Sequence, residues 1–335
     1  MKLARLMIVA SFVACGPAPV VTQDVSFLVP LEQSRAFLSA STVLPRAQFD
    51  RLHPLTVVDE PDALYGALHV VGVRLDPCFF EGGADVTPTC TSQIRLVLQP
   101  VFPAPAGGNE TRDAAMHAFF AVPEAELRTL AGEIADRRAS IDASGDDLGV
   151  TAIDVADLLL PHLGEARLTR VTAMSVHPTG QAWIFSGQDL HGGAATDITI
   201  PGVDEPEQHL TSKGGRATLD ATLLPEPAIE PAIAPYLEQA RRETLDATAI
   251  IDGLDAIERL LDPAEHNPGT ADCASCHVAT TGLRYATRAA DPGRVPAIYD
   301  DTSNQRMFGY FFAAPSVSPR VVAESRAALA HLLAP

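Results

Sequence analysis

The sequence predicts an α+β protein, in which a mostly antiparallel β domain with two helices is followed by a small, mainly α-helical module. Two observations favour this fold class. Runs rich in β-branched and aromatic residues recur between turn-forming residues as far as residue 224. Beyond the proline-rich stretch 225–231, apolar residues recur at three- and four-residue steps instead. We therefore expect a domain over 24–224, a linker over 225–231 and a helical module over 232–335.

The expected β domain contains strands, a short helix within 42–52, and two longer helices. Pro123 opens one of these, with Glu124 and Glu126 in its first turn, and it runs to about Arg138. The other starts at residue 151 or 152 and runs to Leu163. Strands are expected at 24–30, 67–75, 94–102, 114–122, 167–176, 181–185, 196–200 and 217–224.

The expected module begins with the clearest helical pattern in the chain. Apolar residues from Ile250 to Leu261 recur with helical periodicity over 245–261, and Asp262-Pro263 ends the segment. A final helix is expected after Ser318-Pro319, because serine is a good N-cap and proline fits the first helical position.

The net charge is strongly negative. The chain carries 24 basic and 42 acidic residues, a formal charge of −18. Such a surface repels phosphates, so we expect no nucleic-acid partner.

The N-terminus has the composition of an export signal. Lys2 and Arg5 precede an apolar run, and Cys15 follows it directly. Val13-Ala14-Cys15-Gly16 resembles the lipobox of bacterial lipoproteins. The resemblance implies a signal peptide over 1–14, lipidation of Cys15, a tether over 15–23 and a membrane anchor. With no Asp after the cysteine, it further implies sorting to the outer membrane, facing the periplasm. The alternative is an ordinary signal peptide cleaved near Ala14.

The motif with the clearest chemistry is Cys273-Ala274-Ser275-Cys276-His277. It reads C-x-x-C-H, the attachment site of a c-type haem. Two thiols three residues apart on one helical turn point the same way and can bond the two vinyl groups of one porphyrin. His277 can then bind the iron as the proximal ligand.

Residues 232–335 resemble a small c-type cytochrome in the order of helix, C-x-x-C-H, methionine and terminal helix. The resemblance implies one covalent haem c, one-electron transfer and a redox protein partner that the sequence does not identify. Met307 is the candidate distal ligand; His266, His331 and an open position are the alternatives.

Other interpretations of the motif remain. The two thiols can belong to a thioredoxin-like dithiol, to a zinc site completed by His277 and His266, or to a disulfide between Cys273 and Cys276. In the last case the chain would be an envelope binding or assembly lipoprotein, with no haem or an ancillary one. A haem enzyme such as a peroxidase would be expected to carry a second haem motif, which the chain lacks, so an electron carrier is favoured over an enzyme.

Cys78 and Cys90 remain once the other three cysteines are assigned. An even pair in an oxidising compartment is expected to form a disulfide. Such a bridge would contribute roughly 3 kcal/mol to stability on the chain-entropy model.

Overall fold

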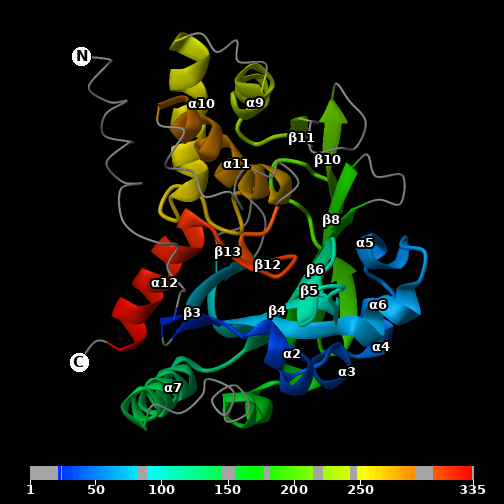
Figure 1. Ribbon diagram of the computed structural model, residues 1–335, viewed down its shortest axis with the longest axis vertical. Coiled ribbons are helices and arrows are strands. Elements are labelled where there is room, and N and C mark those ends of the chain that lie inside the picture. Colours follow the sequence, from blue (N-terminus) through cyan, green and yellow to red (C-terminus); the bar gives the residue numbers. More distant parts are fainter. Residues whose placement is uncertain are drawn as a thin grey trace.

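The computed structural model describes residues 22–23, 25–81, 89–144, 155–176, 182–213, 222–241, 247–290 and 305–333 (Figure 1). The expected signal peptide, Cys15 and the tether up to residue 21 lie outside the described residues. None of the helices described is long and apolar enough to cross a membrane.

A large antiparallel sheet runs through the molecule, and with the helices around it this confirms the predicted α+β class. Its strands follow the order β1-β2-β3-β4-β6-β7-β8-β10-β11, with β5 paired to β4 and β9 to β8. A separate hairpin is formed by β12 and β13. The strands are β1 Thr22–Gln23, β2 Ser26–Leu28, β3 Leu68–Glu81, β4 Thr89–Pro103, β5 Asn109–Thr111, β6 Ala114–Ala121, β7 Leu168–Val176, β8 Ala182–His191, β9 Ala194–Asp197, β10 Glu207–Lys213, β11 Thr222–Glu226, β12 Phe308–Phe311 and β13 Ala314–Val317.

The helices whose bounds are described fall into four groups along the chain. Short helices lie between β2 and β3, one long helix follows β6, and three helices precede the β12–β13 hairpin, which leads to the last helix. Their bounds are α2 Leu31–Phe37, α3 Ala40–Val43, α4 Arg46–Phe49, α5 His53–Thr56, α6 Pro61–Ala67, α7 Glu124–Ser144, α9 Ile233–Arg241, α10 Ala247–Leu261, α11 Cys273–Ala290 and α12 Pro319–Leu332. The second helix expected in the first domain is described over 155–162.

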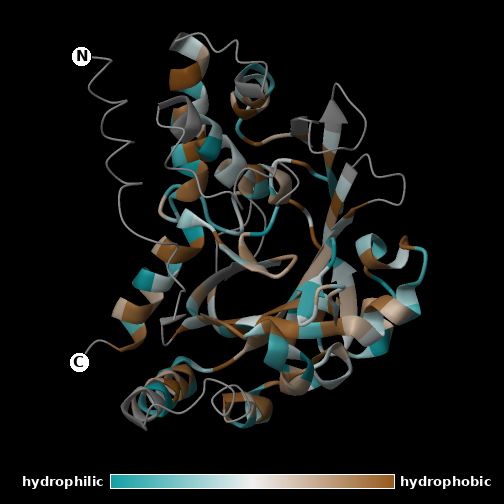
Figure 2. Ribbon diagram, in the orientation of Figure 1, coloured by the Kyte–Doolittle hydropathy of each residue, from teal (hydrophilic) through white to brown (hydrophobic). Residues whose placement is uncertain are grey.

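The two faces of the sheet bury different cores because side chains alternate along each strand. On β4, Ile94, Leu96 and Leu98 enter a core that includes α7. The intervening Val97 faces the other side, where it packs with the β12–β13 hairpin. Helices α9, α10 and α11 cover that other side along β8 and β10 (Figure 1). In Figure 2, α10 and α12 carry both hydrophobic and hydrophilic residues, as expected of helices with one face in a core.

The last part of the chain packs directly on the sheet formed by the first. Ala328 and Leu332 of α12 belong to the same core as the sheet and α7. Phe308 and Tyr310 of β12 pack with Val71 of β3. The two units predicted from the sequence therefore share their cores.

The stretch expected to be a linker is a packed part of the structure. Strand β11 continues to Glu226, and the backbone N–H of Ile229 donates to Asp272 at 2.8 Å. Glu230 is buried and pairs with Arg259 at 2.6 Å. The proline-rich composition thus reflects a turn between β11 and α9.

Candidate cofactor site

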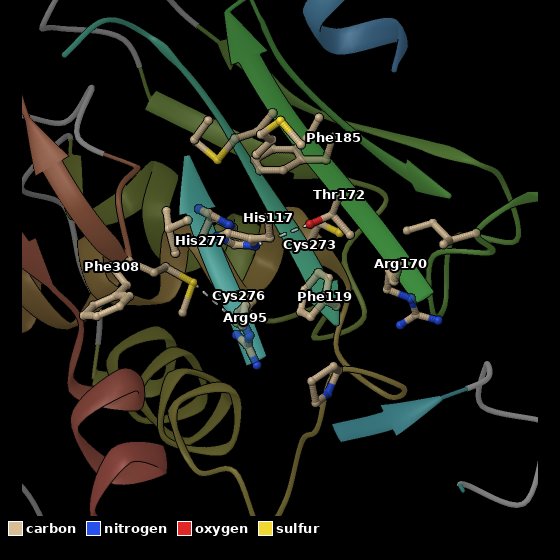
Figure 3. A pocket seen from close by; sticks show the side chains of 18 of the residues that line it. Arg95, His117, Phe119, Arg170, Thr172, Phe185, Cys273, Cys276, His277 and Phe308 are labelled. Carbon is tan, nitrogen blue, oxygen red and sulfur yellow. Dashed lines mark hydrogen bonds between the residues drawn. The ribbon is translucent and has the colours of Figure 1, made fainter. Parts of the chain in front are cut away.

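A cavity of about 340 Å³ lies where α11, the start of β12 and α12 meet the face of the sheet opposite α7 (Figure 3). This volume is within the range of roughly 300–1000 Å³ typical of small-molecule sites. Cys273, Cys276, His277 and Met307 all line it, so the structure brings four of the sequence-predicted residues together. The sheet contributes further lining residues, among them Arg95, Val97, His117, Phe119, Arg170, Thr172 and Phe185.

The start of α11 is held over the cavity by a buried carboxylate. Asp272 precedes the helix, and its Oδ1 accepts the backbone N–H of Ser275 at 2.7 Å, as an N-cap does. The Nε2 of Gln208, on β10, donates to the same oxygen at 2.6 Å, and the Oε1 of Gln208 accepts the N–H of Ala274 at 2.8 Å. The first turn of α11 is thereby fixed to the sheet.

Cys273 and Cys276 are free, partly buried thiols on this first turn. Burial raises the pKa of Cys273 to about 12, and the nearby Asp272 carboxylate adds to the effect. Burial also raises the pKa of Cys276. Both sulfurs are therefore protonated near neutral pH. A dithiol that exchanges disulfides needs a lowered thiol pKa, so the raised pKa values of these two thiols give no support to a thioredoxin-like centre.

The imidazole of His277 is oriented by a backbone carbonyl. Its Nδ1 lies 2.6 Å from the carbonyl oxygen of Gln305, and its ring packs against Phe185 with the centroids 5.0 Å apart. Burial lowers the pKa of His277 to about 4, and the charge of Arg306 adds to the shift against the opposing effect of the Gln305 hydrogen bond. The ring is neutral at physiological pH. With Nδ1 bonded to the carbonyl, Nε2 is left to bind another group.

Met307 lies beside the thiols. Its Sδ is 3.8 Å from the Sγ of Cys276, and it comes two residues after Gln305. The other two candidate ligands are engaged elsewhere. The Nε2 of His266 lies 3.1 Å from Glu230, and the Nε2 of His331 lies 2.9 Å from Glu124 at the surface.

The cavity wall carries charges of both signs. Five arginines line it, and they are Arg74, Arg95, Arg170, Arg306 and Arg320. Each has an acidic partner: Asp76 pairs with Arg74 and Arg95, Asp189 with Arg170, Asp113 with Arg306, and Glu324 with Arg74 and Arg320. Four acidic side chains, Asp189, Asp197, Asp272 and Glu324, line the cavity beside the arginines, so its wall is a network of ion pairs.

The site residues that the sequence did not single out come from the sheet. No sequence motif marks these residues, and the sequence indicated only that side chains alternate along the predicted strands. They are His117, Phe119, Arg95 and Arg170. Conversely, two sequence-predicted residues lie away from the cavity: Cys78 and Cys90 are joined in a disulfide between β3 and β4. Across the described residues, no group of three or more His, Cys, Asp and Glu side chains is arranged to hold a metal ion, and the zinc interpretation, which needs His266, gains no support.

Fold and site together define an α+β protein in which one cavity is bordered by two neutral thiols, an oriented imidazole and a sheet face that carries arginine–carboxylate ion pairs. Comparison of the chain with protein-family models, with curated proteins and with solved structures gives no match.

Proposed function

We propose that this protein is a lipid-anchored, c-type cytochrome-like protein of the bacterial envelope that carries one covalent haem c and transfers single electrons. The observation that carries the proposal is the convergence of the C-x-x-C-H side chains on one cavity. The thiols of Cys273 and Cys276 and the imidazole of His277 all border it from the first turns of α11. Residues 232–335 would correspond to the cytochrome-like part, supplemented by the sheet.

The environment of His277 supports this function. Histidines that bind a metal usually donate their other ring N–H to a carboxylate or a backbone carbonyl, which fixes the ring and its tautomer. The contact of Nδ1 with Gln305 has this form. A ligating imidazole must also be neutral, and burial keeps His277 so.

The cavity walls also suit a porphyrin. Val97, Phe119 and Phe185 offer apolar surface to the ring, while Arg95 and Arg170 lie in the same wall. Both arginines already pair with carboxylates, Asp76 and Asp189, so the two propionate groups of a porphyrin would join these ion pairs or replace the acidic partners.

Each side chain then has a defined task. Cys273 and Cys276 would hold the porphyrin through thioethers, and His277 would bind the iron from the helix side. The aromatic side chains would exclude water, which tunes the potential. When bound, the haem supplies reversible one-electron chemistry. A redox protein partner would exchange the electron at the envelope, where the lipid on Cys15 would keep this protein.

The decisive experiment is to produce the full chain in a bacterial envelope together with the cytochrome c maturation machinery. We expect a coloured protein whose haem stain survives a denaturing gel and whose mass has increased by one porphyrin. Cys273→Ala and Cys276→Ala should lose covalent attachment at one or both vinyl groups. The matched control is the Cys78→Ala/Cys90→Ala double variant, which removes two cysteines outside the site and should stay coloured.

A folded wild-type protein without porphyrin mass, or one in which Cys273 and Cys276 are joined to each other, would overturn the proposal in favour of a binding or assembly lipoprotein. Location is tested separately with Cys15→Ala. This variant should lose labelling by radioactive fatty acid and move from the membrane fraction to the soluble periplasmic fraction.

A further inference from the structure

We propose that His117, from the N-terminal part of the chain, is the second axial ligand of the haem iron. This inference rests on the proposed function and adds to it the ligand on the sheet side. The sequence offered Met307, His266 and His331 for this position, and His117 was not among them.

His117 lies in the middle of the sheet face that borders the cavity. The strand register places His117 in a row of five residues that runs across the sheet. In order, this row consists of Gly72 on β3, Val97 on β4, His117 on β6, Thr172 on β7 and Gly187 on β8. His117 is therefore the largest side chain of its row on the cavity side. It stands at the centre of the five strands, where a planar group lying on the sheet would meet it.

His117 and His277 approach the cavity from two different elements. Both line the same cavity, His117 from β6 and His277 from α11 (Figure 3). Figure 3 shows the two side chains next to each other at the cavity. Two imidazoles that reach one cavity from a helix and from a sheet can bind the two faces of one iron porphyrin.

Two contacts orient the His117 ring. Its Nδ1 lies 3.4 Å from Thr172 Oγ1, and its ring meets Phe119 edge-on with the centroids 6.0 Å apart. These contacts occupy Nδ1 and restrain the ring, so that Nε2 is left for coordination. In His277, too, Nδ1 contacts another group and Nε2 is left for coordination, which is typical of metal-ligating histidines.

Met307 is less well placed for this task. It comes two residues after Gln305, whose carbonyl binds Nδ1 of His277, and its sulfur lies beside Cys276. The backbone before Met307 therefore lies on the Nδ1 side of His277, and the iron would lie on the Nε2 side. The distal ligand must come from beyond the iron, which is the side of the sheet.

The test is spectroscopic and uses the haem-loaded full chain. We expect the wild-type protein to be low-spin with two imidazole ligands, without the long-wavelength charge-transfer band that a methionine sulfur gives on ferric iron. His117→Ala should become high-spin and bind added imidazole or carbon monoxide readily. His117→Met should raise the reduction potential, because a thioether ligand stabilises ferrous iron. The matched control is His69→Ala, which removes a partly buried histidine of the same sheet and should leave the spin state unchanged. Met307→Ala removes the competing ligand, and the two-imidazole spectrum should persist in it.

Each outcome has a definite meaning. A methionine band in the wild type, a five-coordinate wild type, or a His117→Ala spectrum equal to that of the wild type overturns this inference and leaves the proposed function standing. Absence of haem from the wild type overturns the proposed function itself. Should His117→Ala fail to fold, the wild-type near-infrared spectrum still decides between the two ligands.

Discussion

Gln208 and Asp272 join the sheet to the start of α11. The Gln208 amide donates to the Asp272 carboxylate at 2.6 Å, both side chains are buried, and the same amide donates to the carbonyl oxygen of Pro227 at 2.6 Å. The carboxylate in turn caps α11 and accepts the backbone N–H of Ile229. One glutamine on β10 thus sets where the helix begins, and with it where Cys273 stands.

We expect Gln208→Ala to destabilise the protein by about 2 kcal/mol, because it leaves the Asp272 carboxylate and the Ala274 N–H buried with fewer partners. The yield of covalent haem should fall as well, since the first turn of α11 loses its attachment to the sheet. Urea unfolding and haem staining measure the two effects. His209→Ala, at the neighbouring and half-buried position, is the control. Equal stability of the two variants would contradict the role given to Gln208.

We expect Glu324→Gln to cost about 3 kcal/mol of unfolding free energy, because it breaks a buried ionic network. Glu324 of α12 accepts from Arg74 of β3 at 2.6 Å and from Arg320 at 2.8 Å, next to the cavity. Chemical denaturation measures the change. Glu124→Gln removes a carboxylate whose partners lie at the surface, and its midpoint should stay close to that of the wild type. If Glu324→Gln unfolds at the same denaturant concentration as the wild type, the ionic network contributes nothing to stability.

The stability that Glu324 contributes should depend on pH. Burial alone would raise its pKa, but Arg74, Arg320 and Arg95 outweigh this and lower the pKa to about 2. Because the folded pKa lies below the usual value of 4.5, the contribution is complete above that value and is lost as pH falls through the folded pKa. The gap in unfolding free energy between wild type and Glu324→Gln should therefore shrink by about 3 kcal/mol between neutral pH and pH ~2. The other carboxylates titrate in both proteins, so their contributions to the unfolding free energy cancel in this difference. A gap that stays constant with pH would argue against the lowered pKa.

Removing the Cys78–Cys90 bridge should lower the unfolding free energy by about 3 kcal/mol, because the bridge closes a short loop between β3 and β4. The two cysteines are separated by 12 residues in the sequence. The double variant Cys78→Ser/Cys90→Ser should unfold at lower urea concentration and keep its native spectrum. If wild type measured with and without reductant has one midpoint, the bridge has no such effect.

Part of this architecture was predictable from local sequence. The final helix starts as expected, and Ser318 Oγ accepts the N–H of Val321 at 3.2 Å. The helix over 245–261 and most strands were predicted because their periodicity is strong. Strand β10 was missed because its sequence Glu-Gln-His-Leu-Thr-Ser-Lys is polar, and it is a strand because β8 and β11 pair with it on both sides.

The candidate site was predictable only on its helical side. The C-x-x-C-H spacing identified Cys273, Cys276 and His277, since consecutive residues on one turn need no tertiary information. The sheet side could not be assembled in this way, because His117 and Arg170 are brought together by strand register between distant segments. Alternation within 114–121 places His117 on the same face of the strand as Ala115 and Phe119. The local sequence does not indicate which element packs on that face.

Helix α12 closes one side of the cavity with Arg320, Val321 and Glu324, although it follows α11 by more than one intervening element. A polypeptide cut short before Ser318 would still contain Cys273, Cys276 and His277. The cavity that these residues line would lack one wall. The cavity is therefore complete only when α12 has packed beside β3.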